Sequence, residues 1–208
     1  MFPDPVREAD EVLVSGPLLS GKRTVFHRLL REWADEPVVT STRRVAERVR
    51  RDHERATGCG GDDLVIVDCV SATHEDDPSD TPRTKYAAGP GNLTDVGTTY
   101  TGALEGHSGD GAVGITSISP LLMYAPLDAV YRFTRLVAQQ AVGEGYPIAA
   151  VVESQTHDDQ ELHTISEPFD AIIETRVAGD DAEFRARSRA GTTEWRPIPD
   201  EWSPADGT

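Results

Sequence analysis

Short runs of apolar, often β-branched residues recur along the 208-residue chain, separated by longer segments of mixed polarity. Runs of this kind, bounded by turn residues, predict strands that are buried on both faces. We expect six strands, at residues 12–14, 38–40, 64–70, 113–118, 148–152 and 171–175. Because helical patterns lie between several of them, the chain is expected to form a mainly parallel sheet covered by helices.

Three segments space their apolar positions as an amphipathic helix does, namely residues 24–33, 43–57 and 127–142. In the last of these, Val130, Phe133 and Val137 repeat at intervals of three or four and so share one face. Gly143 and Gly145 mark the end of this pattern. The helix is therefore expected to pack its apolar face on the sheet.

Two parts of the chain depart from this alternation. Residues 73–111 are rich in Asp, Pro, Gly, Ser and Thr, and only 96–104 has a weak helical pattern, which predicts a loop-rich insertion with one short helix. Residues 184–188 and 193–197 predict the two arms of a C-terminal antiparallel hairpin.

The length of the chain suits one α/β domain with a substantial core. We place this domain at residues 11–199, after an N-terminal extension (1–10) and before a disordered tail (200–208). Cys59 and Cys69 lack metal-ligand spacing, so both are expected to be reduced thiols of a cytoplasmic protein. No run of apolar residues is long enough for a signal peptide or a membrane span, and no membrane partner is expected.

Acidic residues dominate the charge, with 36 Asp and Glu against 20 Lys and Arg and a formal net charge of −16. Such a surface repels nucleic acid, so a nucleic-acid partner is not expected. The acidity and the scarcity of lysine resemble the composition of proteins from halophilic archaea. Only two of the 20 basic residues are lysines, Lys22 and Lys85, and the first of them belongs to a distinctive loop.

This glycine-rich loop follows the first predicted strand and leads into the first predicted helix. It fits the phosphate-binding pattern GxxxxGK[ST] except at the last position, where Arg23 replaces the hydroxyl residue. The glycines let backbone N–H groups point at phosphate oxygens, the helix N-terminus adds positive dipole, and Lys22 can reach the β and γ phosphates. We expect nucleotide binding by Gly16, Pro17, Leu18, Leu19, Ser20, Gly21, Lys22, Arg23 and Thr24.

Three further blocks accompany the loop: 113–133 (VGITSISPLLMYAPLDAVYRF), 157–160 (HDDQ) and 168–174 (PFDAIIE). Together with the loop they resemble the KaiC-like branch of the RecA-superfamily P-loop ATPases, and more closely the short KaiC-like proteins of haloarchaea. The resemblance covers most of residues 10–178. It implies a RecA-like P-loop domain with ATP as ligand, Mg²⁺ as its companion ion, and a partner that is another copy of the chain or a related signalling protein.

The chain departs from this family where catalysis needs specific groups. The family's magnesium-holding Asp aligns with Thr116, and its paired glutamates, which activate water, align with residues 40–42, where no carboxylate stands. Arg23 stands at the motif position where the family has the hydroxyl residue that binds magnesium. Hydrolysis is therefore expected to be very slow or absent. The leading hypothesis is a nucleotide-binding protein with a degenerate catalytic site and a regulatory or scaffolding role.

Two other functions stay open on the sequence. One is an active ATPase in which Thr24 and Asp68, the latter at the end of a predicted strand, hold Mg²⁺, with missing groups supplied by a neighbouring subunit. Thr116 is the third magnesium candidate. The other is an interaction module whose pocket is vestigial and empty.

Polar residues also follow the predicted strand 148–152. In a RecA-like sheet Glu153, Ser154 and Gln155 would lie near the γ-phosphate, and Gln155 is the best candidate for sensing it. Nearby, the histidines His157 and His163 lie in an acidic stretch with Asp158 and Asp159, but they are six residues apart, and no helical periodicity brings the two rings together. We therefore interpret them as an acidic surface loop rather than a metal site.

Overall fold

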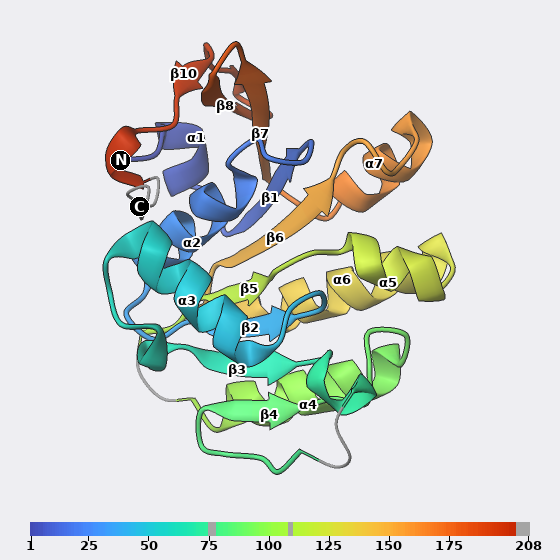
Figure 1. The fold of residues 1–208 in the computed structure, drawn as a ribbon. Coiled ribbons are helices and arrows are strands. Elements are labelled where there is room, and N and C mark those ends of the chain that lie inside the picture. The colour runs from blue at the N-terminus through green and yellow to red at the C-terminus, as the bar shows by residue number, and fades with distance from the viewer. Residues whose placement is uncertain (75–77, 108–109, 203–208) are drawn as a thin grey trace.

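The computed structural model describes residues 1–74, 78–107 and 110–202, which are built around one central sheet (Figure 1). Its strands are β1 (Glu11–Gly16), β2 (Val38–Ser41), β3 (Val65–Asp68), β4 (Thr84–Tyr86), β5 (Val113–Ile115), β6 (Ile148–Glu153), β7 (Ala171–Ala178), β8 (Asp181–Ser188), β9 (Gly191–Thr192) and β10 (Arg196–Pro197). Their order across the sheet is β10-β8-β7-β1-β6-β5-β2-β3-β4, and β9 pairs with β8.

The strands from β7 to β4 in this order run parallel, so their carboxyl ends meet at one edge of the sheet. The register sets Gly16, the last residue of β1, beside Glu153, the last residue of β6. It also sets Thr40 of β2 beside Ile115 of β5. All six predicted strands are present, and the expected α/β class with a mainly parallel sheet is confirmed.

Helices cover both faces of the sheet (Figure 1). One face carries α1 (Asp4–Arg7), α2 (Lys22–Trp33) and α3 (Ala46–Thr57), and the other carries α4 (Leu93–Glu105), α5 (Ser119–Tyr124), α6 (Leu127–Gly143) and α7 (Asp159–Ser166). Successive side chains of a strand point to opposite faces, so Val12 and Val14 join the core under α2 while Leu13 joins the core that contains α6. The three predicted helices correspond to α2, α3 and α6. Within the described residues no helix is both long and apolar enough to cross a membrane.

The segment that was expected to be loop-rich contains more structure than its composition indicates. It forms β4 at the edge of the sheet and the 13-residue helix α4. Gly97 and Gly102 weaken the intrinsic helix propensity of α4. The helix is stabilised instead by burial of Val96, Tyr100 and Leu104, each at most 4% exposed. Residues 75–77 and 108–109 of this segment lie outside the described residues.

The C-terminal part contains the expected antiparallel pairing, in which the predicted arm 184–188 belongs to β8 and the predicted arm 193–197 is reduced to the short strand β10 next to β9. The main hairpin is formed instead by β7 and β8. Phe2 and Trp202 pack together on this hairpin with ring centroids 4.9 Å apart, and Phe2 also contacts Phe184. The first ten residues, which we expected to be an extension, therefore contribute Phe2 and Val6 to the core. Residues 203–208 of the expected tail lie outside the described residues. Short 3₁₀ helices complete the structure at Gly61–Asp63, Ser71–Thr73 and Asp200–Trp202.

Candidate functional site

The glycine-rich loop spans the tight connection from the end of β1 to the start of α2. Gly16 ends β1 where a Cβ atom would lie 1.9 Å from Oγ1 of Thr175, so a larger residue cannot occupy this position without a shift. Gly21 is the N-cap of α2 and has φ of 78°, a left-handed conformation that favours glycine. Gly16 is thus required by close packing and Gly21 by its backbone conformation, and the loop curls as the sequence predicted.

Hydrogen bonds within the protein hold the loop in this shape. The hydroxyl of Ser20 donates to the carbonyl of Pro17 at 2.8 Å and lies 2.6 Å from the hydroxyl of Thr175 in β7. Leu19, at the loop tip, has φ of 63° and is 93% exposed. The first N–H groups of α2 have no partner within the helix. The loop therefore offers preformed backbone donors and positive helix dipole to an anion.

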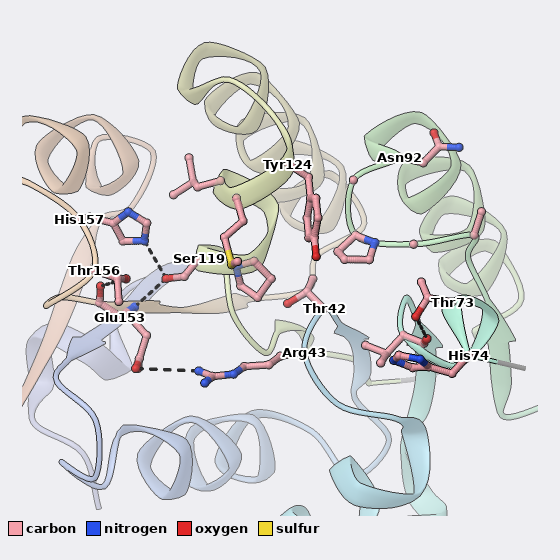
Figure 2. Close-up of a pocket in the computed structure, with 18 of the residues that line it drawn as sticks. Thr42, Arg43, Thr73, His74, Asn92, Ser119, Tyr124, Glu153, Thr156 and His157 are labelled. Atoms are coloured by element: carbon pink, nitrogen blue, oxygen red, sulfur yellow. Dashed lines mark hydrogen bonds and ion pairs between the residues drawn. The ribbon is translucent and has the colours of Figure 1, made fainter.

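Lys22 lies at the base of the loop and is only 9% exposed. Its Nζ donates to the carbonyl of Pro17 at 2.6 Å and forms an ion pair with Oε1 of Glu153 on the adjacent strand β6. Oε2 of Glu153 faces Arg43, at 4.0 Å from a guanidinium nitrogen (Figure 2). The loop lysine thus has a carboxylate of its own chain as partner, in the place where the motif predicts phosphate.

The loop opens on a cavity of about 690 Å³. Besides the loop, its walls include Arg23 of α2, Arg43 and Arg44 after β2, Asp52 of α3 and Glu153. With Lys22, the cavity walls carry four cationic side chains against two carboxylates, a net charge of +2 in a chain whose net charge is −16. The cavity is therefore a local exception to the acidity of the protein and suits an anionic ligand.

The arginines are organised by Asp52, whose side chain is 5% exposed. Its Oδ2 is 2.9 Å from Arg44 and 3.6 Å from Arg23, and its Oδ1 is 3.7 Å from Arg48. Burial is the main factor that lowers the pKa of Arg44, and the neighbouring Arg23 lowers it further, while Asp52 opposes both. One carboxylate therefore holds three guanidinium groups together, and positive charge is left over for a ligand.

The ends of β2 and β5 carry hydroxyl groups at positions where the KaiC-like family that the sequence resembles has carboxylates. The hydroxyl of Thr116, just after β5, accepts a hydrogen bond from the backbone N–H of Thr42 at 3.2 Å. The hydroxyl of Thr42 donates to the carbonyl of Ser117 at 2.5 Å. Both hydroxyl groups are thus engaged in hydrogen bonds within the protein, and neither brings negative charge to the cavity.

Asp68 ends β3 and is fully buried. Its Oδ2 accepts from the N–H of Ala46, the first residue of α3, at 2.7 Å and from the hydroxyl of Ser71 at 2.8 Å. Its Oδ1 accepts from the N–H groups of Val70 and Ser71 at 2.8 and 2.9 Å. Because four donors occupy both oxygens and Asp68 does not line the loop cavity, the carboxylate fixes the start of α3. We do not retain it as a magnesium or catalytic candidate.

The other residues that the sequence predicted for the site do not all line the loop cavity. Thr24 lines the loop cavity one position beyond Arg23. Gln155 is exposed and lines neither the loop cavity nor the larger one beside it, whereas Glu153 lines both. Asp52 was not singled out from the sequence, although its spacing of four from Arg48 on one helix is a signal of an ion pair.

The larger neighbouring cavity, about 960 Å³, lies at the carboxyl ends of the strands (Figure 2). It shares Leu18, Arg43 and Glu153 with the loop cavity. On one wall, the hydroxyl of Ser119 accepts from the N–H of Glu153 at 3.0 Å and lies 2.9 Å from Nε2 of His157. The other nitrogen of His157 is 3.3 Å from a carboxylate oxygen of Glu161 in α7. A chain of polar contacts thus joins the end of β6 to α7.

Two buried histidines lie behind the arginine cluster. Nδ1 of His27 in α2 is 3.3 Å from Nδ1 of His53 in α3, and both side chains are at most 2% exposed. Burial lowers the pKa of His27 well below its ordinary value, with further lowering by His53 and by Arg23 and Arg44. Burial, with Arg31 as a lesser cause, lowers the pKa of His53 to about 4, against a small opposing effect of Asp63. Both rings are therefore neutral at pH 7.

This pair predicts a loss of stability in mild acid. The histidines of the unfolded chain take up protons near pH 6.5, whereas those of the folded protein do not. The contribution of the two neutral rings to the free energy of unfolding is therefore fully present above pH 6.5 and is lost as the pH drops toward about 4. For each proton that only the unfolded state binds, the free energy of unfolding falls by up to about 1.4 kcal/mol per pH unit. Urea unfolding at several pH values should show this slope, and His53→Gln should reduce it. His163→Gln, on the exposed side of α7, should leave it unchanged; a flat wild-type profile between pH 6.5 and 5 would contradict the expectation.

Several solved structures share the fold of this chain, among them the following three. The KaiC-like protein PH0186 from Pyrococcus horikoshii OT3 aligns with a TM-score of 0.63 at 12% identity, over 92% of this chain and 86% of that one. The flagellar accessory protein FlaH from Methanocaldococcus jannaschii aligns with a TM-score of 0.59 at 16% identity, over 87% and 78%. The uncharacterized protein PH0321 from Pyrococcus horikoshii, in complex with an unknown peptide, gives 0.56 at 12% identity, over 92% and 93%.

The chain therefore has the RecA-like fold of KaiC-like proteins, as its motifs indicated. Residues 9–175 match the family described as a family of unknown function, DUF7504, and the chain belongs to this family. No curated protein sequence matches it significantly. The closer resemblance to haloarchaeal proteins stays a prediction from composition and motifs.

Proposed function

We propose that this protein binds ATP or a related nucleotide at the loop between β1 and α2, and that it acts as a regulatory or scaffolding protein rather than an efficient hydrolase. The observation that carries the proposal is the buried Lys22 at the base of a preformed glycine loop, in a cationic cavity of a strongly acidic protein. Lys22 and the N–H groups at the start of α2 would hold the phosphates. The loop follows the carboxyl end of β1, and ligands of α/β proteins bind at this edge of a sheet, which supports the proposal.

Inefficient hydrolysis is inferred from the groups around the loop. A hydrolase needs a carboxylate or an equivalent group to orient water and further groups to neutralise the charge that develops on the transferred phosphoryl group. Thr42 and Thr116 occupy the strand ends where such carboxylates would stand. The carboxylates in the cavity walls, Asp52 and Glu153, are both engaged in ion pairs with cationic side chains.

A route for reporting the bound state starts at Glu153. A phosphate that takes Lys22 as partner releases this carboxylate, whose backbone N–H is bonded to Ser119 and through it to His157. A shift at the end of β6 would then reach α7, which begins two residues after His157. A second copy of the chain or a related signalling protein is the partner that we expect to respond to this change.

The proposal is tested by calorimetric titration of ATP into the wild-type protein and the Glu153→Gln variant in concentrated potassium chloride, with phosphate release assayed on the same samples. Both should bind ATP without sustained release. Glu153→Gln should bind about tenfold more tightly, because it removes a carboxylate that competes for Lys22 and repels phosphate. Glu105→Gln, an exposed glutamate at the end of α4, is the matched control and should bind like the wild type. Absence of ATP binding would favour an interaction module with an empty pocket. Steady release of phosphate would favour an active ATPase.

A further inference from the structure

The residues that the structure describes around the loop do not form a site for Mg²⁺. In P-loop proteins the ion is held by a loop hydroxyl and by a carboxylate at a strand end, together with phosphate oxygens. Arg23 stands at the first position, and the strand-end position is Thr116, whose hydroxyl already accepts from Thr42. Thr24 offers one hydroxyl in the cavity wall, but among the wall residues that the structure describes no carboxylate accompanies it as a free ligand.

The two carboxylates in the described walls of this cavity are committed to cations. Asp52 is buried among Arg23, Arg44 and Arg48 at 2.9 to 3.7 Å. Glu153 is paired with Lys22. A divalent ion that used Asp52 would have to displace guanidinium groups whose positive charge would then repel it. The set of donors that a hard cation requires is therefore missing from the described walls of the cavity.

Arginine side chains occupy the space instead. The side chains of Arg23 and Arg43 are 54% and 55% exposed, so each has freedom to turn toward a ligand in the cavity. Arg44 is held more firmly by Asp52 at 2.9 Å and is half-buried. A guanidinium stays protonated, donates up to five hydrogen bonds and matches a phosphate group with paired donors. These three arginines can supply the counter-charge that Mg²⁺ supplies elsewhere.

We propose that the loop cavity binds a nucleoside triphosphate without Mg²⁺, with Arg23, Arg43 and Arg44 in place of the ion. This inference rests on the proposed function, since it concerns the form of the nucleotide that the same loop takes. Free triphosphate carries more negative charge than its magnesium complex, so the cationic cavity favours the free form. Magnesium is then a competitor for the ligand rather than a part of the site.

The test compares calorimetric titrations of ATP in excess EDTA with titrations in excess magnesium chloride, at the same concentration of potassium chloride. The wild type should bind free ATP at least as tightly as ATP with Mg²⁺. Arg23→Thr, which restores the hydroxyl of the motif, and Arg43→Gln should each weaken the binding of free ATP about tenfold. Arg135→Thr, an exposed arginine of α6 on the other side of the sheet, is the matched control. Thermal unfolding without ligand verifies that each variant is folded.

The outcomes separate this inference from the proposed function. Binding that is about tenfold or more tighter with Mg²⁺, and that depends on Lys22, would keep nucleotide binding and overturn the arginine proposal. If that preference for Mg²⁺ disappears in Glu153→Gln, Glu153 is a ligand of the ion, which also overturns it. Absence of ATP binding under both conditions overturns both. Binding in EDTA that weakens in the two arginine variants but not in Arg135→Thr supports the proposal.

Discussion

Replacing Lys22 with alanine is expected to weaken ATP binding at least about a hundredfold. The variant loses a charge-assisted contact with phosphate, each such contact being worth about 1.5–3 kcal/mol. It also leaves Glu153, which is 5% exposed, without its closest ion-pair partner and facing the incoming phosphate, with only the more distant Arg43 beside it among the cationic side chains that the structure describes. The two effects have the same sign, so this should be the largest loss of affinity from any single change in the loop.

The chain offers a matched control for this experiment because it has only one other lysine. Lys85 lies on β4, 3.5 Å from Asp80, and Lys85→Ala should bind ATP like the wild type. The double variant Lys22→Ala with Glu153→Gln should recover part of the lost affinity, since the repelling carboxylate is then gone. Unchanged affinity in Lys22→Ala would show that nucleotide, if bound, lies elsewhere.

The largest loss of stability is expected for Asp68→Asn, at about 2–4 kcal/mol. An asparagine side chain turns one acceptor into a donor, which would face the N–H of Ala46 and the hydroxyl of Ser71, or alternatively the N–H groups of Val70 and Ser71. The position is fully buried, so water cannot restore the lost bonds. Urea unfolding at constant salt measures the loss. ATP binding, measured where the variant is still folded, should stay close to the wild-type value.

The exposed pair Asp128 and Arg132 on α6 provides the comparison for Asp68. Both side chains are more than 70% exposed, so Asp128→Asn should change the free energy of unfolding by less than about 1 kcal/mol. A loss of ATP binding in Asp68→Asn without a loss of stability would have the opposite meaning. It would restore Asp68 as a ligand and, with it, the active ATPase that uses Thr24 and Asp68.

The parallel core of the fold could be predicted from the sequence because its strands are short, apolar and bounded by turns. The strand before Gly16 and the helix after Lys22 were both expected, and so was the loop between them. Strand β4 and the length of α4 could not be predicted in the same way. Their local sequences are polar or rich in glycine and threonine, and burial of Tyr100 and its neighbours against the sheet stabilises them.

The parts of the site could be recognised in the sequence, but their pairing could not. Lys22 and Glu153 are distant along the chain and meet because β1 and β6 are neighbours in the sheet. The contact between Arg23 and Asp52 depends likewise on the packing of α2 against α3. Asp68 has the form of a metal-supporting residue, and only the position of α3 shows that its oxygens are taken by the backbone. Contacts of this kind belong to topology rather than to local pattern.

The short strands at the two edges of the sheet bear on how copies of this chain could associate. At one edge β9 and β10 are each two residues long, and β10 includes Pro197, which has no N–H to donate; at the other edge β4 is three residues long. An edge with so few backbone donors and acceptors is a poor template for adding a strand from another molecule. A continuous sheet shared between copies is thus disfavoured, both as a route to aggregation and as a way to assemble. Copies that do associate would meet through side chains of loops and helices, among which the exposed leucines at the tip of the glycine loop stand beside the cationic cavity.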